Sequence, residues 1–557
     1  MCIRDRRIAD REVTTPGDDA AVLVAMNPAA LRSELARLAK GGTLILNGDG
    51  FDERSLAKAG YDADPRGTAE LDAYEVIDVP MTSLTKLAVK GTGVSGRHAG
   101  RSKNFFALGI LAWMYTRDTE AVNAWIDEKF SGDDAVRQAN RRALSAGHAF
   151  GETAELGANA VIVPASKRAP GTYRSVDGNT ALAWGLIAAG VCAELPVFLG
   201  SYPITPASAI LHELARHPDA GVRTFQAEDE IAAITSAIGA AFGGDLAVTT
   251  TSGPGLALKA EALGLAVSLE LPLIVVDIQR GGPATGLPTK TEASDLMIAM
   301  YGRHGESPLP VISASRPGEC FEVAIEAARL ALKYRTPVIL LSDGYLANSS
   351  EPWRLPDVSE LPDISVAKTT EPNHERPDGG SDFWPYERDP DTLARPWAVP
   401  GTPGLEHRIG GLEKADGTGN ISYDPDNHQR MTDLRAAKVA GIAGDIPPAV
   451  VEGDVDADVL IVGWGSTWGA ITHAMARLAN AGHRTAHVHL RHLNPFPANL
   501  GEVLGRYSTI VVPELNSGQL SRLLRAEFLV DAHPVSKVEG QPFSAAELTA
   551  RISEVLR

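Results

Sequence analysis

Polar and glycine-rich loops follow four apolar segments in the middle of the chain. The segments at 197–200, 222–227, 246–251 and 273–279 are typical of buried strands. Ligands bind where the carboxyl ends of parallel strands meet, so these loops predict one pocket at one sheet edge, although loops are also polar without any ligand. The loops include a threonine between two prolines, an acidic trio, a Ser-Gly-Pro-Gly turn and an arginine: Thr205, Glu228, Asp229, Glu230, Ser252, Gly253 and Arg280.

The acidic trio stands at the start of a helix predicted over 231–242. Residues four and seven positions apart share a helix face, which places Glu230 on the apolar face with Ile234, Ala237 and Ala241. Glu228 and Asp229 fall on other faces, where the favourable interaction of an acid with a helix N-terminus accounts for them. Glu230 needs a partner, because an unpaired buried carboxylate is costly. It is therefore the carboxylate we expect to do chemistry.

Alternating strand and helix signals place the chain in the α/β class. Strands are expected at 22–27, 43–47 and around Val76, with helices at 28–39 and from Phe105. The middle block continues with strands at 311–314 and 338–344, and a third block opens with a strand at 459–465. The middle strands are continuous apolar runs, which favours a parallel sheet covered on both faces.

The chain of 557 residues is too long for one hydrophobic core and is expected to form several domains. We predict an α/β domain at 1–165, a second at 170–350 and a third at 453–557. Residues 351–452 are rich in Pro, Gly, Asp and Asn, which indicates a linker or a long functional loop.

Composition excludes several classes of protein. The net charge of −18 argues against binding to nucleic acid, and no apolar run is long enough for a membrane span. The three cysteines, Cys2, Cys192 and Cys320, lack the spacing of a zinc site and cannot supply the four thiolates of an iron–sulfur cluster. These features favour a cytoplasmic protein.

Two motifs carry weak signals of cofactor binding. Gly48-Asp49-Gly50 is similar to a magnesium–pyrophosphate motif, but no asparagine follows at the required spacing, so a turn after a strand is expected. Gly463-x-Gly465-x-x-x-Gly469 follows a strand as a dinucleotide motif would, but its spacing differs by one residue. The next strand ends in His489-Leu490-Arg491 rather than in an acid, which favours a tight strand–helix turn.

The order of several longer motifs resembles one enzyme family. GNTALAWGLIAAG, YPITPAS, QAEDEIAAITSAIGAAFGG, TTTSGPGLALKAEALGLA, DIQRGGPATGLPTKTEASDL and PELNSGQLSRLLR are similar to the 2-oxoacid:ferredoxin oxidoreductases, in particular to fused gamma–alpha subunits of the 2-oxoglutarate type. FFALGILAWMYTRD and NAWIDEKFSGDDAVRQAN are similar to the family's gamma domain. The resemblance covers residues 13–557, and it implies a pyrimidine-binding central domain and a transketolase C-terminal-like last domain.

The resemblance implies that 2-oxoglutarate, CoA and oxidised ferredoxin become succinyl-CoA, carbon dioxide and reduced ferredoxin, with thiamine diphosphate as cofactor. Glu230 aligns with the glutamate that hydrogen-bonds the aminopyrimidine ring of the cofactor. Thr205 and Arg280 align with residues that hold the carboxylate and keto end of the substrate, for which a planar guanidinium is suited. Further contacts are expected from the substrate loop and around the cofactor: Thr289, Lys290, Tyr202, Ser252 and Gly253.

The sequence departs from the family pattern in two ways, and the second bears on the expected partner. MCIRDRRIAD stands where the gamma domain has a strand and a glycine-rich turn, so we expect an N-terminally truncated first domain. The Mg²⁺-binding GDG domain and the cysteines of a [4Fe–4S] cluster are absent, and in this family they belong to a separate beta subunit. The resemblance therefore implies a heterodimer in which the beta subunit is obligatory, with ferredoxin as electron acceptor.

Three alternatives stay open at this stage. The substrate could be pyruvate or a branched-chain 2-oxoacid. The chain could instead be a nucleotide-binding α/β protein that uses the turn around Gly465. It could also be a non-catalytic scaffold, in which case Glu230, Thr205 and Arg280 would not converge.

Overall fold

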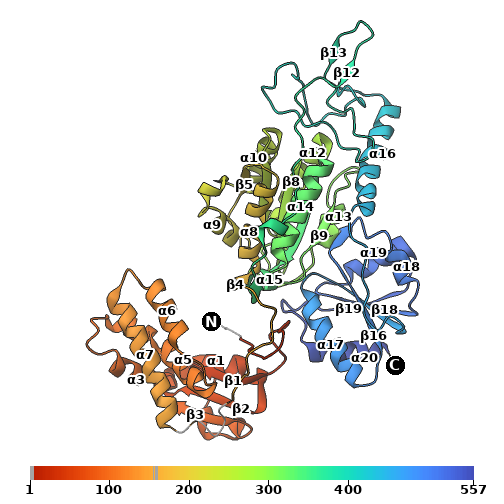
Figure 1. Cartoon of the computed structure of the whole chain (residues 1–557). Helices are drawn as coiled ribbons and strands as arrows, with labels where there is room; N and C mark the ends of the chain where they lie inside the picture. The colour runs from red at the N-terminus through yellow and green to blue at the C-terminus, as the bar shows by residue number, and fades with distance from the viewer. Residues whose placement is uncertain (1–5, 155, 157–160, 557) are drawn as a thin grey trace. The chain divides into compact units, whose positions relative to one another are not determined.

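The computed structural model describes residues 6–154, 156 and 161–556. The chain divides into two compact units, Met1–Ala169 and Pro170–Arg557, which are drawn in Figure 1. Both combine helices with parallel strands, as the sequence predicts. The unusual opening segment falls partly outside the described residues, which begin at Arg6. No helix in the described ranges is long and apolar enough to span a membrane.

The first unit is built on a three-stranded parallel sheet in the order β1-β2-β3. The predicted strands are present, and β2 begins five residues earlier than expected. Strands and helices have these bounds: β1 Ala20–Ala25, α1 Pro28–Glu34, β2 Leu38–Asn47, α2 Glu53–Ala59, β3 Glu75–Val79, α3 Met81–Ala88, α4 Gly96–Arg101, α5 Lys103–Met114, α6 Glu120–Lys129 and α7 Asp134–Thr153.

Glycines allow α5 and α7 to pack closely in the first unit. A side chain at Gly109 would meet the backbone of Leu144, and one at Gly147 would meet the backbone of Phe106. The absence of both side chains lets the two backbones touch, and Ile110 and Ala143 are buried in the core beside them. The expected buried helix from Phe105 is therefore present as α5.

The Gly48-Asp49-Gly50 motif forms a short 3-10 turn at the end of β2. Both carboxylate oxygens of Asp49 accept hydrogen bonds from Ser83, from its backbone N at 2.7 Å and its hydroxyl at 3.1 Å. This contact gives a partner to a backbone N–H in the first turn of α3, which has no intrahelical acceptor. The motif is thus a structural turn, as expected.

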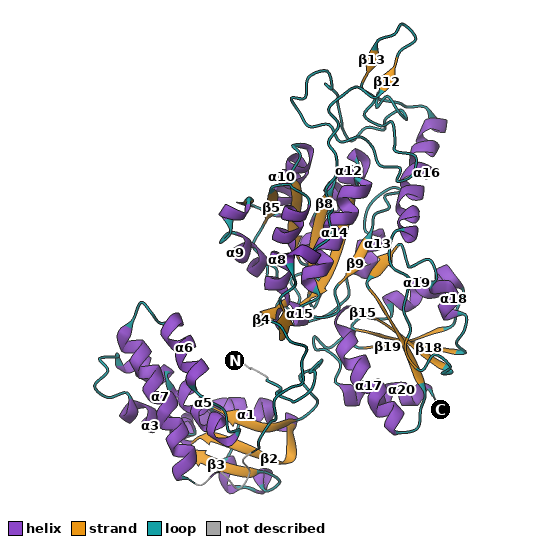
Figure 2. Ribbon diagram, viewed as in Figure 1, coloured by secondary structure: helices purple, strands orange, loops and turns teal. Residues whose placement is uncertain are grey.

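The second unit contains a seven-stranded sheet in the order β17-β9-β10-β8-β7-β5-β6, which is parallel except for β17. Figure 2 shows helices around this sheet. The central elements have these bounds: β4 Tyr173–Asp177, α8 Gly178–Cys192, β5 Val197–Ser201, α9 Ser208–Leu214, β6 Val222–Gln226, α10 Glu230–Phe242, β7 Leu246–Thr251, α11 Gly253–Leu258, α12 Ala260–Leu269, β8 Leu273–Gln279, α13 Leu296–Tyr301, β9 Val311–Ser313, α14 Cys320–Tyr334, β10 Pro337–Asp343, α15 Gly344–Asn348 and β11 Ser350–Arg354.

Two hydrophobic cores cover the two faces of this sheet. Val275 of β8 packs in a core with α10 and α12, whereas its neighbours Ile274 and Val276 pack with α8 and α14. Because successive strand residues point to opposite faces, a strand covered on both sides must be apolar throughout. This explains the uninterrupted apolar runs in the sequence.

The last block forms a five-stranded sheet in the order β14-β16-β15-β18-β19. One strand of this block, β17, leaves it and pairs antiparallel with β9 of the central sheet. The two sheets also share one hydrophobic core, which joins Val311 of β9 to Val462 of β15. The elements are β14 Glu452–Gly453, β15 Val459–Trp464, α17 Trp468–Asn480, β16 Thr485–Leu490, β17 His492–Asn494, α18 Leu500–Leu504, β18 Thr509–Glu514, α19 Gln519–Phe528, β19 Ala532–Ser536 and α20 Ala545–Val555.

The segment at 351–452, expected to be a linker or long loop, is partly folded onto the central domain. Besides the short strands β12 His374–Glu375 and β13 Ser381–Asp382, it contains the helix α16 Pro425–Gly441. Arg388 binds the buried Glu270 carboxylate with both terminal nitrogens, and Lys438 of α16 lies 2.5 Å from it. Burial raises the pKa of Glu270, but the two cations outweigh it and hold the pKa at about 2. The polar composition of this segment does not reveal its attachment, which depends on ion pairs as well as on apolar packing.

Candidate active site

The four polar loops meet at one edge of the central sheet. In the register of the parallel strands, Ser201 at the end of β5 stands beside Gln226 of β6 and Thr250 of β7. Thr251 of β7 stands beside Asp277 of β8. A hydrogen bond of 2.7 Å between the Ser201 and Thr250 hydroxyl groups joins β5 to β7. The carboxyl ends therefore form a continuous rim, as the sequence predicts.

Glu230 begins α10 on its buried face. It is 8% exposed, and Ile234, Ala237 and Ala241 below it are also buried. Glu228 and Asp229 are exposed, and the Asp229 carboxylate caps the helix by accepting a 2.8 Å hydrogen bond from the Ala232 backbone N. The helical-face prediction is confirmed for all three acids.

The Glu230 side chain lies against the glycine turn after β7. A side chain at Gly255 would meet the Thr251 hydroxyl, and its Cβ would lie 2.8 Å from Glu230 Cγ. The Ser252 hydroxyl in this turn is buried and has no hydrogen-bond partner within the described ranges, and the Glu230 carboxylate lies beside the same turn. Buried polar groups are normally hydrogen-bonded. This turn therefore offers an acceptor and a hydroxyl to a group outside the chain.

Arg280 lies in the loop after β8 and is held by backbone oxygens. Its Nη1 donates to the Thr205 carbonyl at 2.6 Å, and its Nη2 donates to the Thr285 carbonyl at 3.2 Å. The residue is 7% exposed, and Nε has no partner in the described part of the chain. The arginine thus joins the loops after β5 and β8, and Thr205 and Arg280 converge as expected.

The other predicted contacts lie at the surface of the same edge. Tyr202 follows β5 and is 37% exposed, and Thr289 and Lys290 are exposed at the end of the Arg280 loop. That loop folds back on itself, because Gly281 N donates to the Lys290 carbonyl at 3.0 Å and Leu287 N to the Gly281 carbonyl at 2.8 Å. Lys290 therefore has a fixed backbone and an exposed side chain.

The structure adds a pair of neighbouring acids that sequence reasoning did not identify. Asp277 is fully buried in β8, and burial together with the neighbouring Asp295 raises its pKa well above the ordinary value. Burial also raises the pKa of Asp295 to about 6, with a further contribution from Glu292. Asp295 lies against Gly253, where a Cβ would be 2.7 Å from its Oδ2. The signal in the sequence was a single charged residue inside the LIVVDIQ run.

Two further side chains hold the loops in place. Asn179 of α8 donates a 2.9 Å hydrogen bond to the Pro206 carbonyl, which fixes the loop that carries Thr205. Asn516, in the loop after β18, donates at 2.7 Å to the Ala293 carbonyl, which fixes the end of the Arg280 loop. The motifs GNTALAWG and PELNSGQL thus support the rim from neighbouring elements.

The turn around Gly465 does not provide a nucleotide site. Residues 463–467 are buried, and the Thr467 hydroxyl is used to cap the Trp464 backbone. A pyrophosphate needs accessible N–H groups at a helix N-terminus. The tight strand–helix turn expected from the sequence is confirmed.

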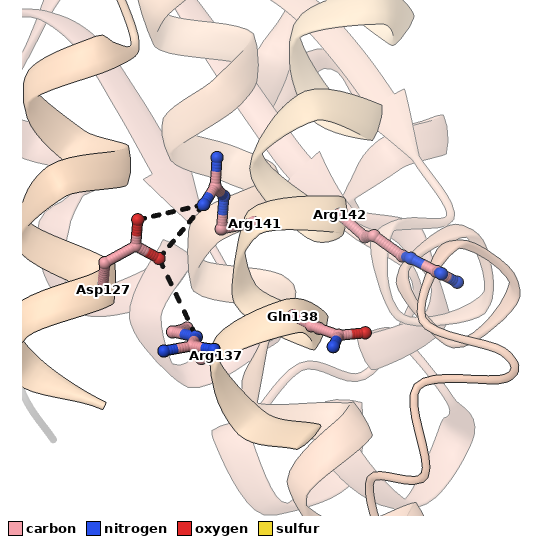
Figure 3. A pocket seen from close by; sticks show the side chains of 5 residues that line it. All are labelled: Asp127, Arg137, Gln138, Arg141 and Arg142. Atoms are coloured by element: carbon pink, nitrogen blue, oxygen red, sulfur yellow. Dashed lines mark hydrogen bonds and ion pairs between the residues drawn. The ribbon is translucent and has the colours of Figure 1, made fainter. Parts of the chain in front are cut away.

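The first unit contains a shallow pocket of about 570 Å³ between α6 and α7 (Figure 3). Three arginines line it, but Asp127 binds Arg141 at 2.9 Å and lies 4.0 Å from Arg137. Arg142 donates to the Lys90 carbonyl at 3.1 Å. Much of the positive charge is therefore already compensated within the protein.

Comparison with known proteins assigns both units to related families. The family described as pyruvate flavodoxin/ferredoxin oxidoreductase, thiamine diphosphate-binding, matches residues 189–422. The family described as pyruvate ferredoxin/flavodoxin oxidoreductase matches residues 3–150. The rim described above lies inside the first match, so the class of protein is that of thiamine-diphosphate-binding oxidoreductases.

Individual relatives narrow this class. The 2-oxoglutarate oxidoreductase subunit KorA of Mycobacterium tuberculosis is 54% identical over 97% of this chain and 82% of the relative. The alpha subunit of 2-oxoacid:ferredoxin oxidoreductase 1 of Aeropyrum pernix is 34% identical over 86% of this chain and 75% of the relative. A solved 2-oxoglutarate:ferredoxin oxidoreductase from Magnetococcus marinus, with 2-oxoglutarate, coenzyme A and succinyl-CoA bound, has a TM-score of 0.85 at 33% identity and covers 98% of this chain and 90% of that one. The chain belongs to the 2-oxoacid:ferredoxin oxidoreductase family, as an alpha-type subunit.

The residues at the rim fit the aminopyrimidine end of thiamine diphosphate. The buried Glu230 carboxylate can accept a hydrogen bond from a ring nitrogen, and the Ser252 hydroxyl, which has no partner in the described part of the chain, can bond a further polar atom of the cofactor. Among the described residues, no group of three or more His, Cys, Asp or Glu side chains could hold a metal ion.

Proposed function

We propose that this chain is the alpha-type subunit of a 2-oxoglutarate:ferredoxin oxidoreductase, which converts 2-oxoglutarate, CoA and oxidised ferredoxin to succinyl-CoA, carbon dioxide and reduced ferredoxin. The observation that carries the proposal is the convergence of Arg280 and Thr205 on the rim that also holds the buried Glu230 side chain. The 54% identity to a 2-oxoglutarate oxidoreductase subunit supports this choice of substrate.

Glu230 is the catalytic residue of this proposal. Thiamine diphosphate, when bound, supplies the electron sink that makes decarboxylation of a 2-oxoacid feasible. Glu230 would accept a hydrogen bond from the aminopyrimidine ring. This bond would favour the protonation state of the ring that the reaction needs. Tyr202, Ser252 and Gly253 would contact the cofactor around it. The buried apolar helix face suits this role, because it excludes water from the carboxylate.

Arg280 and Thr205 would bind the 1-carboxylate and the keto end of the substrate. Two of the arginine's terminal donors already hold backbone carbonyls, so the guanidinium plane is fixed before substrate arrives. Such fixed donors favour catalysis, because they need no reorganisation during the reaction. Thr289 and Lys290 would contact the distal carboxylate of 2-oxoglutarate from the same loop.

The remaining parts of the active site would come from a beta subunit. Three cysteines cannot supply the four thiolates of a [4Fe–4S] cluster, which we therefore place in the beta subunit together with Mg²⁺. The beta subunit would be obligatory, ferredoxin would accept the electrons, and the complex would act in the cytoplasm.

The proposal is tested by purifying the chain alone and with its cognate beta subunit. Alone it should be colourless and inactive. The complex should be brown and should reduce methyl viologen only when 2-oxoglutarate, CoA and thiamine diphosphate are all present, with succinyl-CoA identified by mass spectrometry. Cluster absorbance in the isolated chain would refute the assignment of the cluster.

Parallel assays with pyruvate and a branched-chain 2-oxoacid test the substrate. We expect 2-oxoglutarate to have the highest kcat/KM. A higher value for either of the others would overturn the substrate and leave the cofactor assignment in place.

A further inference from the structure

A buried lysine supports the first residue of α10. Lys259, between α11 and α12, is fully buried, and its Nζ donates a 2.7 Å hydrogen bond to the backbone carbonyl of Glu230. This carbonyl is the one hydrogen-bond acceptor recorded for the ammonium group in the described part of the chain. A buried ammonium has three donors to satisfy, so one acceptor is an incomplete set.

The position of the Lys259 ammonium is electrostatically unfavourable, so stability of the fold does not explain it. The N-terminus of a helix carries positive partial charge, which favours anions and opposes cations. Burial lowers the pKa of Lys259 to about 8, and the charges of Glu230 and Asp229 only partly oppose this shift. Asp229 is exposed at the helix cap, and Glu261 near the start of α12 is exposed to solvent. The buried negative group beside the ammonium is therefore Glu230.

Another buried lysine in the same unit, Lys414, has a complete set of hydrogen-bond acceptors and serves as a structural comparison. The Lys414 ammonium donates to the Ser268 hydroxyl at 3.0 Å, the Gly410 carbonyl at 2.8 Å and the Leu412 carbonyl at 2.9 Å. Its three donors are satisfied, and it joins the segment after β13 to α12. Lys259 differs because its single bond is to the residue that would do the chemistry.

We propose that Lys259 is a positioning residue for Glu230: its hydrogen bond to the Glu230 carbonyl fixes the first turn of α10, and with it the place of the Glu230 side chain at the rim. The inference rests on the proposed function of Glu230. Removal of the ammonium would leave the Glu230 carbonyl without this donor and would free the first turn of α10 to shift. A displaced carboxylate would bind its hydrogen-bond donor less well, because catalytic groups depend on precise placement.

The test compares Lys259→Met with Lys414→Met in the complex of this chain with its beta subunit. Lys259→Met should lower kcat/KM for 2-oxoglutarate by about 10–100-fold, the range expected when a hydrogen bond to a charged group is lost. Its unfolding midpoint at pH 7 should be unchanged or higher, because an incompletely paired buried charge is replaced by an apolar side chain. Lys414→Met should lower the midpoint and leave kcat/KM within a few-fold of the starting enzyme.

Rescue by a conservative variant separates positioning from a packing role. Lys259→Gln keeps a donor that can bond the Glu230 carbonyl, so its kcat/KM should lie between those of the unmodified complex and Lys259→Met. Full activity of Lys259→Met, or equal losses in the two variants, would overturn the inference.

A double-mutant cycle tests the pair without any activity assay. Glu230→Gln should lower the unfolding midpoint more when Lys259 is present than in the Lys259→Met background, because only the first leaves an ammonium without its counter-charge. Additive effects would overturn the inference even if the enzyme is inactive toward 2-oxoglutarate. Inactivity of the unmodified complex alone would refute the proposed function, and the cycle would still decide the inference.

Discussion

The guanidinium of Arg280 donates a 2.6 Å hydrogen bond to the backbone carbonyl of Thr205, 75 positions earlier in the chain. The bond joins the loops after β5 and β8, which flank β7 in the sheet. Because the acceptor is a backbone atom, the orientation of the arginine does not depend on the Thr205 side chain. The Thr205 hydroxyl takes no part in this bond, as the proposed substrate contact requires.

Arg280→Lys should lower kcat/KM for every 2-oxoacid by about 10–100-fold, because lysine keeps the charge but cannot bind two carbonyls and a carboxylate from one plane. The measurement is viologen reduction by the complex. Arg303→Lys is the matched control: Arg303 is also held by backbone carbonyls, of Ala299, Met300 and Ser307, away from the rim. It should affect stability more than turnover. Equal losses in both variants would contradict a role for Arg280 in substrate binding.

Glu230→Gln should reduce turnover by about 10²–10⁴-fold, the usual contribution of a group that governs proton transfer, with the fold retained. Glu228→Gln should have little effect, because Glu228 is exposed. Asp229→Asn should also be mild, since asparagine caps helices as well as aspartate does. Comparable losses in the three variants would refute the helical-face argument. Circular dichroism checks that each variant is folded.

Thr289→Ala and Lys290→Met test the substrate loop. A desolvated carboxylate needs a partner, so both changes should reduce kcat/KM for 2-oxoglutarate and spare pyruvate, which lacks the distal carboxylate. The two substrates are assayed side by side for each variant. A uniform loss, or none, would move the specificity determinant to the beta subunit.

Asp277→Asn should stabilise the second unit at pH 8 by about 1–2 kcal/mol, because the amide can donate to the Asp295 carboxylate. The pKa of Asp295 is raised from 3.8 to about 6. The folded state therefore holds more protons than the unfolded state between these values, and stability falls as pH rises through this window. The gain should be smaller at pH 5, where the pair still shares a proton.

Calorimetry at the two pH values measures this difference, with the exposed Asp391→Asn as control. Equal gains at both pH values, or a loss at pH 8, would show that repulsion between Asp277 and Asp295 does not lower the free energy of unfolding.

The rim was predictable because it follows from strand order and side-chain type. The sequence placed Glu230 on the buried face of α10 from spacing alone, and placed Thr205 and Arg280 at one edge from the parallel sheet. The roles of these residues stay predictions. Asp277 and Lys259 were missed because their importance depends on burial and on neighbours distant in sequence, which local pattern does not reveal.

The attachment of the segment at 351–452 was missed for a related reason. Glu270, Arg388 and Lys438 are ordinary surface residues by type, and only their meeting makes them buried partners. The helix α16 has charged and polar residues around most of its circumference, so it lacks the apolar stripe that identifies a helix in sequence.

The position of strand β17 affects folding of the central sheet during translation. It lies in the last block of the sequence, yet it forms the outer strand of the central sheet beside β9. During synthesis, β9 and β10 leave the ribosome well before residues 492–494, so β9 remains an unpaired edge for the time needed to translate the whole intervening segment. Exposed strand edges promote association between chains. Slowing or truncating translation between these points should therefore favour aggregation of the nascent subunit.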